Sequence, residues 1–440
     1  MTEGARPTRF RLPRVAASLA NPNIRRYLIG QQLSNGGLWM QQTAELWLIL
    51  ELTGSGTALG LHAVFRFGPL LLFGAHGGLV GDRFPRLRTL TITQTLHALG
   101  ASVLVFVALS PEPSLAVIYA VGLFQGSVNA IDNPLRRTFI RDLASDAELP
   151  NAVALNSTMA TVTRTLGPAV AGLTIALVGV VGCFAVNTLS YGAVLIALSR
   201  LDRSTMRPPT FAPKGRGQVR AGLSYAWGDL PIRRTLAVSG VVGIFAWNYN
   251  TIMPVYATTA LGGGASLYGY LLSIVGVGSF VGALVAARAV GRHDARLVAS
   301  MGLLVVALVS VALAPGIVAA SVSLLLLGAA GTSVIIASQT RLQLRARDEM
   351  AGRIMALFSV LFVGSKPIGG ALGGWLIDLS GPRLAFAIGA VVIGLAGLWL
   401  LVSRWAARRT ERRSMRTSTG DAIGYRTSRT PAPHPEPKTQ

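Results

Sequence analysis

Long apolar stretches, separated by short polar or charged segments, recur along almost the whole chain. Each stretch runs for about 20 residues, the length that an α-helix needs to cross the hydrocarbon core of a bilayer. Continuous apolar runs with internal Gly and Pro favour helices over the alternating strands of a membrane β-barrel. The pattern predicts twelve membrane-spanning helices, at residues 27–52, 58–80, 89–110, 114–136, 153–177, 181–200, 232–258, 267–288, 297–315, 318–340, 354–378 and 384–403.

Composition favours a membrane protein over a soluble enzyme. The chain is 51% hydrophobic and only 13% charged, and its 50 glycines suit closely packed membrane helices. Cys183 is the single cysteine, and the five histidines show no metal-ligand spacing. The sequence contains no Gly-Lys-Ser/Thr phosphate loop and no nucleophile–base arrangement. We therefore expect no metal, no cofactor and no enzymatic activity, and an ion gradient rather than ATP as the energy source.

The formal net charge of +22 follows the alternation of a membrane topology. Nearly all of the 40 Lys and Arg residues fall at the two ends and in alternate connections, and only Arg383 lies in a connection on the other side. This positive-inside pattern predicts a multi-pass protein of the plasma membrane with both termini in the cytoplasm. Because the cations form no single patch, we expect contacts with anionic lipid and no nucleic-acid partner.

A polar interruption at 201–231, rich in Pro and Arg, lies between the sixth and seventh predicted spans. Within it, apolar residues recur at helical spacing, which predicts an amphipathic helix on the membrane surface, with a plain spacer as the alternative. The segment Gly77–Arg83 (GGLVGDR) after the second span is echoed by Gly282–Arg288 (GALVAAR) after the eighth. Two repeated halves of six spans are typical of a parallel-repeat transporter.

The predicted organisation has five parts. Basic segments with few apolar residues begin and end the chain, and the last is expected to be disordered because it cannot bury a core. The parts are a basic N-terminal segment 1–26, a six-helix bundle 27–200, a cytoplasmic linker 201–231, a second six-helix bundle 232–403 and a basic tail 404–440.

Two predicted spans carry a polar stripe along one helical face. On the first span the stripe comprises Gln31, Asn35, Leu38, Gln42 and Glu45, and on the fourth Gln125, Asn129, Asp132 and Arg136. Polar side chains are costly against lipid, so both stripes are expected to face a water-filled cavity or, alternatively, to hydrogen-bond between helices. The predicted substrate cavity comprises Gln31, Asn35, Gln42, Gln125, Asn129, Trp247, Asn250, Thr332, Gln339 and Lys366.

Four ionisable residues within the N-terminal spans sum to zero charge: Glu45, Arg66, Asp132 and Arg164. The helical rise places Glu45 and Arg66 at similar depth, so they are expected to pair. Asp132 lies nearer the cytoplasmic side of the membrane, within reach of either Arg164 or Arg136. A carboxylate that gains and loses a guanidinium partner changes its proton affinity, so we predict that Glu45 or Asp132 exchanges a proton during transport. A static ion pair is the alternative for each.

Lys366 precedes Pro367 in the eleventh predicted span, where the same helix offers no acid except Asp378. An anionic group of the cargo is one candidate partner for this ammonium. The alternatives are a side chain that extends to the membrane surface or a neutral buried amine.

The loop Gly78–Arg86 (GLVGDRFPR) resembles the loop motif of the major facilitator superfamily, with Gly78, Asp82, Arg83 and Arg86 in place. Further segments resemble the drug:proton antiporter branch of that superfamily, which includes the enterobactin exporter and macrolide efflux pumps. They are residues 34–55, 65–74, 132–137, 149–157, 164–172 and 342–357. Where this branch often has Pro, the chain has Glu45.

The resemblance implies the fold of the superfamily, with two pseudo-symmetric six-helix halves. It implies that Asp82 latches the cytoplasmic gate and that Arg83 and Arg86 brace the loop. It also implies proton-coupled efflux of a small amphipathic molecule, such as a drug, a macrolide-like compound or a siderophore, by alternating access. The expected partners are this substrate, protons and membrane lipids, with the chain acting as a monomer. An uptake permease, by symport or facilitated diffusion, and a non-transporting membrane sensor are the alternatives.

Overall fold

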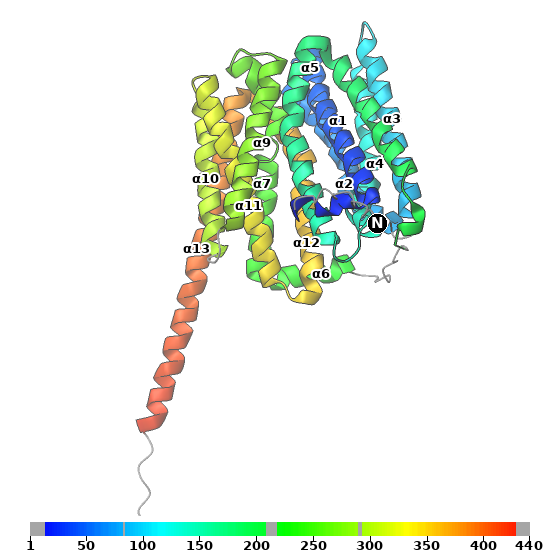
Figure 1. Ribbon diagram of the computed structural model, residues 1–440. Coiled ribbons are helices and arrows are strands. Elements are labelled where there is room, and N and C mark those ends of the chain that lie inside the picture. The colour runs from blue at the N-terminus through cyan, green and yellow to red at the C-terminus, as the bar shows by residue number, and fades with distance from the viewer. Residues whose placement is uncertain (1–13, 82–83, 208–217, 289–292, 428–440) are drawn as a thin grey trace, which may run out of the picture.

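The computed structural model describes residues 14–81, 84–207, 218–288 and 293–427, and every regular element in these ranges is helical. The long helices run side by side as a bundle, and the last one extends well beyond it (Figure 1). The elements are η1 (Arg14–Ala20), α1 (Pro22–Thr53), α2 (Gly56–Gly81), α3 (Arg86–Leu109), α4 (Leu115–Leu143), α5 (Leu149–Ser199), η2 (Arg203–Thr205), α6 (Gln218–Gly228), α7 (Leu230–Phe245), α8 (Tyr249–Val255), η3 (Tyr256–Ala260), α9 (Ala265–Arg288), α10 (His293–Leu313), α11 (Ile317–Arg345), α12 (Asp348–Val363) and α13 (Ser365–Thr427).

The helices α5 and α13 are longer than a bilayer requires, and each is interrupted by a glycine. Gly179 in α5 has φ 75° and Gly381 in α13 has φ 80°, in the left-handed region that favours glycine. In α5 the chain turns back on itself, since the Cys183 thiol donates to the carbonyl oxygen of Ala171 at 3.6 Å across the turn. Each of these helices therefore supplies two segments to the bundle.

The all-helical membrane fold is confirmed, whereas the number of spans stays a prediction. Length and hydropathy identify nine candidate membrane spans among the described residues. Two of these, Leu149–Ser199 and Asp348–Ser403, contain the turns at Gly179 and Gly381, and α1 is not among the nine. The polar stripe of α1 lowers its hydropathy, although its length of 32 residues is enough to cross a bilayer.

The helix α13 continues to Thr427, into the segment 404–440 for which the sequence predicts disorder, and that disorder stays a prediction. Between Gly397 and Gly420 the sequence has neither Gly nor Pro, and it is rich in Arg, a good helix former. Because this segment has few apolar residues, it gains little by packing against the bundle. Its backbone nevertheless continues as a helix. Residues 428–440, like 1–13 at the other end, lie outside the described ranges.

The segment after α5 is fastened to the end of the bundle where α1 begins. The Asn23 side chain donates to the carbonyl oxygen of Asp202 at 2.9 Å, and Arg26 donates to that of Arg200 at 2.8 Å. Arg207 forms an ion pair with Asp146 at 2.8 Å in the α4–α5 loop, and its hydrogen bond lowers the pKa of that exposed carboxyl. We call this end of the molecule the basic end.

Residues 208–217 of the predicted linker lie outside the described ranges, and α6 follows them. On α6, Ala226 is buried, whereas the side chains of Leu223 and Trp227 are 52% and 68% exposed. The guanidinium of Arg233 lies 5.5 Å from the centroid of the Trp227 ring. The division of the chain into two halves at 201–231 stays a prediction.

Small residues allow α2 and α13 to pack backbone against backbone. A Cβ atom added at Gly60 would lie 2.5 Å from the carbonyl oxygen of Gly370, and one added at Gly370 would lie 2.5 Å from the Cβ of Ala63. One added at Gly374 would overlap the carbonyl oxygen of Gly56. Such contacts between small residues are a common way for membrane helices to associate. They join segments that the sequence assigns to different halves.

Candidate functional site

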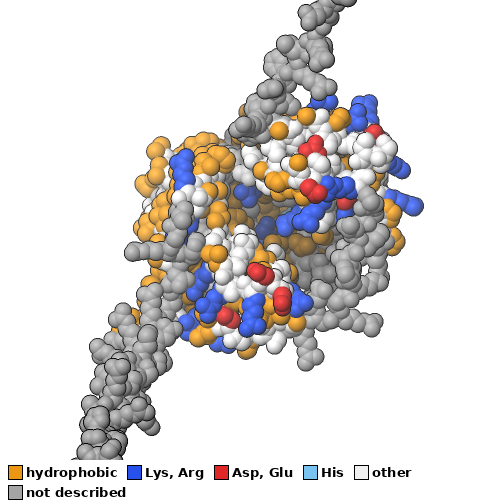
Figure 2. All heavy atoms as spheres, turned by 60° about the horizontal axis from the view of Figure 1, so that its bottom comes forward, with side chains coloured by type: hydrophobic (Ala, Val, Ile, Leu, Met, Phe, Trp, Pro, Cys, Tyr) orange, Lys and Arg blue, Asp and Glu red, His pale blue; other side chains and the backbone are white. Residues whose placement is uncertain are grey.

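A small cavity of about 60 Å³ lies inside the bundle, between α1, α2, α5, α8, α9 and α13. The polar and charged residues in its wall include Gln42, Glu45, His62, Arg66, Asn250 and Lys366, beside the aromatic side chains of Trp39, Phe67, Trp247 and Tyr268. Seen from the basic end, the molecule is hollowed between two lobes, with Lys and Arg side chains around and inside the hollow (Figure 2). The cavity thus combines aromatic and aliphatic side chains with convergent polar and charged groups, as small-molecule sites do.

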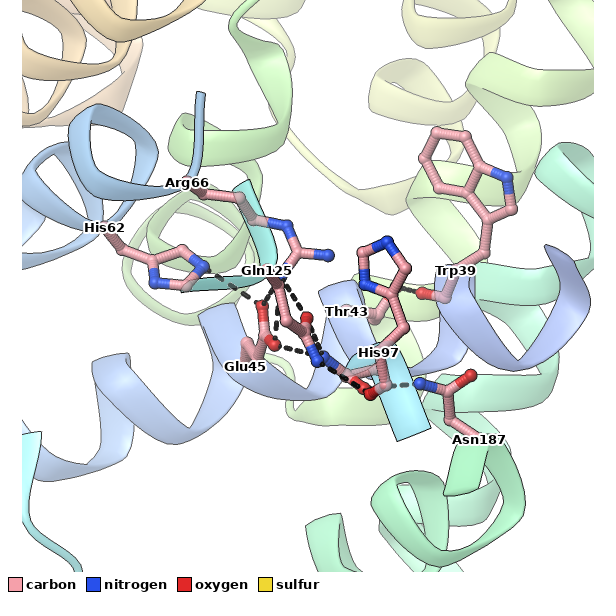
Figure 3. A network of polar contacts seen from close by, with 9 residues as sticks. Trp39, Thr43, Glu45, His62, Arg66, His97, Gln125 and Asn187 are labelled. Carbon is pink, nitrogen blue, oxygen red and sulfur yellow. Dashed lines mark hydrogen bonds and ion pairs between the residues drawn. The ribbon is translucent and has the colours of Figure 1, made fainter. Parts of the chain in front are cut away.

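The Glu45 carboxylate is the centre of a buried polar network, the Glu45 cluster, which comprises Gln41, Glu45, His62, Arg66 and Gln125 (Figure 3). Arg66 Nη1 lies 3.1 Å from Glu45 Oε2, and His62 Nε2 lies 3.1 Å from the same oxygen. Gln41 donates to Glu45 Oε1 at 2.6 Å. The Glu45 side chain is only 1% exposed, so its charge depends on these partners rather than on water.

Helical spacing and one close helix contact assemble the Glu45 cluster. Gln41 precedes Glu45 by four residues on α1, and His62 precedes Arg66 by four on α2, so each pair shares one face of its helix. Arg66 Nη1 also donates to Gln125 Oε1 on α4 at 3.0 Å. A Cβ atom at Gly126 would overlap the carbonyl oxygen of Arg66, so this glycine is what allows α2 and α4 to approach so closely.

Asp132 is the centre of a second network, the Asp132 cluster, located on α3, α4 and α1. The fully buried carboxylate accepts from Thr93 Oγ1 at 2.6 Å and from Gln94 Nε2 at 2.8 Å, and it pairs with Arg136 one turn along α4. Arg136 in turn donates to Asn35 Oδ1 on α1 at 3.2 Å. Three donor residues on two helices therefore satisfy this carboxylate completely, as a buried charge requires.

His97 on α3 lies between the two networks. Its backbone carbonyl oxygen accepts from Gln125 Nε2 at 3.5 Å, and its ring stacks on Tyr191 with the centroids 5.8 Å apart. Both ring nitrogens are buried and have no hydrogen-bond partner in the part of the chain that the structure describes. Figure 3 shows His97 beside the Glu45 cluster, with Asn187 of α5 donating to Gln41.

The sequence profile of the transmembrane secretion effector family matches residues 15–425, nearly the whole chain. The chain belongs to this family of major facilitator superfamily transporters. The predicted membership of the superfamily is therefore confirmed.

Curated relatives of this transmembrane secretion effector include siderophore transporters. The enterobactin exporter of Shigella boydii is 25% identical over 402 residues, which cover 89% of the chain and 94% of that exporter. The staphyloferrin A transporter of Staphylococcus aureus is 23% identical over 252 residues, which cover 57% of the chain and 63% of that transporter, less than two thirds of its length.

Solved structures resemble the secretion effector in fold. The nucleoside transporter NupG superposes with a TM-score of 0.69 at 13% identity, over 86% of this chain and 98% of that one. A bacterial homologue of the iron transporter ferroportin, in its inward-facing state, gives a TM-score of 0.67 at 13% identity over 86% and 98% of the two chains. At this identity the likeness shows the transporter fold alone.

The structure brings together some of the predicted site residues and separates others. Glu45 and Arg66 form an ion pair, and Asp132 pairs with Arg136 rather than with Arg164. Both acids lie inside the bundle and not on its lipid-facing surface. Of the residues predicted for the cavity, those in its wall are Gln42, Trp247, Asn250 and Lys366.

The other residues predicted for the cavity lie away from its wall. Gln125 belongs to the Glu45 cluster, while Gln31 donates to Asn35 at 3.3 Å beside the Asp132 cluster. Three half-buried residues belong to neither network and do not line the cavity: Asn129, Thr332 and Gln339. The wall of the cavity therefore contains four of the ten residues that the sequence predicts for it.

The loop predicted as the cytoplasmic gate is described only at its two ends. Gly78 lies in the last turns of α2, whereas Asp82 and Arg83 lie outside the described residues. Arg86 is the first residue of α3 and forms an ion pair with Asp142 of α4 at 2.6 Å. The predicted latch role of Asp82 thus stays a prediction.

Several polar residues of the site escaped the sequence analysis. His62 and Gln41 belong to the Glu45 cluster, Asn187 donates to Gln41, and His97 lies beside the cluster. The signal that could have found the first two is the four-residue spacing from Arg66 and Glu45 on the same helix faces. Asn187 and His97 reach the site only through the packing of α5 and α3, which no local pattern reveals.

At the end opposite the basic end, Asp378 of α13 caps the beginning of α2. Its carboxylate accepts from Ser55 Oγ at 2.7 Å, from the backbone N–H of Gly56 at 2.5 Å and from that of Thr57 at 2.8 Å. The first N–H groups of a helix lack internal partners and favour a negative charge. The acid therefore ties α13 to α2 at this end, next to the glycine contact between the same two helices.

Proposed function

We propose that this protein is a secondary active transporter that exports a small amphipathic molecule across the plasma membrane in exchange for protons. The observation that carries the proposal is the Glu45 carboxylate, which is buried, lines the central cavity and pairs with both Arg66 and His62. An ionisable group inside a membrane bundle is costly to keep and is typical of a proton or ion pathway.

The geometry supports Glu45 rather than Asp132 as the proton carrier. Glu45 lines the cavity, so movement of the surrounding helices changes both its access to water and its distance from Arg66. Separation from the guanidinium favours the protonated carboxyl, and renewed contact favours release of the proton. Asp132 does not line the cavity, and Thr93, Gln94 and Arg136 surround it, which suits a static structural pair.

Two further observations support the direction and the type of cargo. The positive-inside rule assigns the basic end to the cytoplasm, so the hollow in Figure 2 would open to the cytoplasmic side. One relative is an enterobactin exporter, and another is a staphyloferrin A transporter. A siderophore is therefore the first cargo to test, followed by macrolide-like drugs, and we expect Asp82 to latch the cytoplasmic gate as the family resemblance implies.

Transport in inside-out membrane vesicles tests this function. With the vesicle lumen acidified and no ATP present, we expect enterobactin, the first probe, to accumulate in vesicles that contain the protein, and we expect a protonophore to stop the accumulation. Vesicles from the same host without the protein are the control. Accumulation in right-side-out vesicles alone would indicate uptake, and transport that ignores the pH gradient would contradict proton coupling.

The Asp378 cap is expected to help close the cavity at the end opposite the basic end, which this proposal assigns to the outside of the cell. In a Cys183→Ser background, Thr251→Cys introduces a thiol in the cavity wall, and a membrane-impermeant maleimide added to intact spheroplasts reports access from outside. Loss of an exposed charge at a helix N-terminus amounts to about 0.3–1 kcal/mol, so Asp378→Asn is expected to accelerate labelling about two- to fivefold.

Glu112→Gln, a change at an exposed acid in the α3–α4 loop, is the matched control for this labelling experiment and should leave the rate unchanged. A labelling rate that Asp378→Asn does not alter would show that the glycine contact alone holds the outer end closed.

A further inference from the structure

The charges around the central cavity do not balance. Arg66 and Lys366 line it, and Arg164 on α5 lies close enough to Lys366 to interact with it electrostatically. Among the described residues, Glu45 is the single acid in the wall. Arg66 is committed to Glu45 and Gln125. The remaining cations, Arg164 and Lys366, have no acidic partner among the residues that the structure describes.

The surroundings of Lys366 are apolar on one side and open to the cavity on the other. Its ammonium lies 4.5 Å from the centroid of the Phe67 ring, a cation–π contact that offsets only part of the lost hydration. The side chain is half-buried, and no carboxylate approaches it within the described part of the chain. A cation held this way in a membrane bundle favours the arrival of an anion.

A second side chain of the same wall has an unused hydrogen-bond donor. The Tyr268 residue on α9 is fully buried and lines the cavity, and its ring stacks on Trp47 with the centroids 6.0 Å apart. Its hydroxyl has no hydrogen-bond partner among the described residues. A buried hydroxyl without a partner is costly, so a ligand that accepts its hydrogen bond gains affinity.

We propose that Lys366 and Tyr268 form an anion subsite that binds a carboxylate, or another oxygen anion, of the cargo, with Arg164 adding to the local positive potential. The proposal rests on the transport function proposed above and assigns to it a class of substrate: amphipathic molecules that carry an acidic group beside an apolar or aromatic body. Trp39, Phe67 and Trp247 supply the aromatic surface for that body.

The size of the cavity agrees with this assignment. Its volume of about 60 Å³ has room for about two water molecules, which is on the order of the volume of one carboxylate group. The acidic group therefore fits the cavity in the present state, and the rest of a larger cargo requires the walls to separate, as they do in alternating access.

Binding to the purified full chain tests the subsite without any gradient. The probes are 1-naphthoate and its uncharged analogue 1-naphthamide, which share one ring system and differ in charge, and calorimetry measures their dissociation constants. A charge-assisted hydrogen bond is about twice as strong as a neutral one, so we expect the wild-type chain to prefer 1-naphthoate by about tenfold. Lys366→Gln should lower this preference to about twofold or less, and Tyr268→Phe should lower it severalfold.

Two variants act as controls. Lys366→Arg keeps the positive charge and should retain most of the preference. Arg233→Gln removes a cation that also lies over an aromatic ring, Trp227, but outside the cavity, and should change nothing. Thermal unfolding of each variant checks that the chain is still folded.

Equal affinity of the wild-type chain for the two probes would overturn the proposal, as would an unchanged preference in folded Lys366→Gln. Sulfate serves as an inorganic probe: if sulfate binds through Lys366 while 1-naphthoate does not, the subsite is one for an inorganic anion and the assignment to cargo is wrong. Failure of proton-driven transport with a Lys366-dependent preference intact would contradict the proposed coupling and leave the anion subsite standing.

Discussion

Replacing Glu45 by glutamine is expected to abolish proton-driven export while leaving the cargo site in place. The amide keeps the size of the side chain but cannot take up and release a proton in the physiological pH range. It also leaves the buried guanidinium of Arg66 without its counterion, and removal of one partner of a buried ion pair costs about 3–5 kcal/mol. In inside-out vesicles we expect the gradient-driven rate to fall at least tenfold, with binding of the cargo changed less than the rate.

A matched variant on the same helix distinguishes loss of the buried Glu45 carboxylate from any general effect of a Glu→Gln substitution in α1. Glu51 lies near the end of α1, is exposed and accepts from Trp47 Nε1 at 2.6 Å, so Glu51→Gln should transport like the wild type. The double variant Glu45→Gln/Arg66→Gln removes both charges and should recover much of the lost stability without recovering the pH dependence. Export that remains fully gradient-driven in Glu45→Gln would rule out Glu45 as the proton carrier.

Replacing Asp132 by asparagine is expected to destabilise the protein strongly and, unlike Glu45→Gln, to leave transport coupled to the proton gradient. The carboxylate holds Thr93, Gln94 and Arg136, and Arg136 reaches across to Asn35 on α1. Without the negative charge the guanidinium is left unpaired in the bundle, at a cost of about 3–5 kcal/mol. Thermal unfolding in detergent should show a melting temperature lower by several degrees, while the protein that remains folded keeps its dependence on the pH gradient.

Asp146→Asn is the matched control for this second prediction, because Asp146 also pairs with an arginine but lies exposed in a loop. Its melting temperature should not change measurably, since exposed ion pairs contribute little. If Asp132→Asn loses the pH dependence of transport and keeps its melting temperature, then Asp132 rather than Glu45 carries the proton, and the roles proposed for the two acids are reversed.

Local spacing explains which parts of the site were predictable from the sequence. The stripe on the first span placed Glu45 inside the bundle, and the helical rise correctly matched its depth to that of Arg66. Asp132 pairs with Arg136, which lies one turn away on the same helix, and not with Arg164 on α5. These interactions depend on periods of a single helix or on depth in the membrane, and both quantities can be read from a sequence.

The remaining features depend on packing between helices, which the sequence does not specify locally. His97 lies at the site because α3 packs there, and Thr332 and Gln339 lie away from the cavity although their span was expected to line it. The unexpected helix up to Thr427 has a different cause, since helix propensity can extend an element that has no apolar face to bury. Burial pattern and helix propensity are separate signals, and in the tail only helix propensity favours a regular element.

The glycine contact between α2 and α13 bears on how quickly the two helices can part. Where bulky side chains interlock, each must change rotamer before the surfaces slide, and every such change adds to the activation barrier. Gly60, Gly370 and Gly374 have no side chain that must change rotamer before these backbones could part. In the transport cycle proposed above, this glycine contact would therefore add little to the barrier for separating α2 from α13, and the Asp378 cap would contribute more to it.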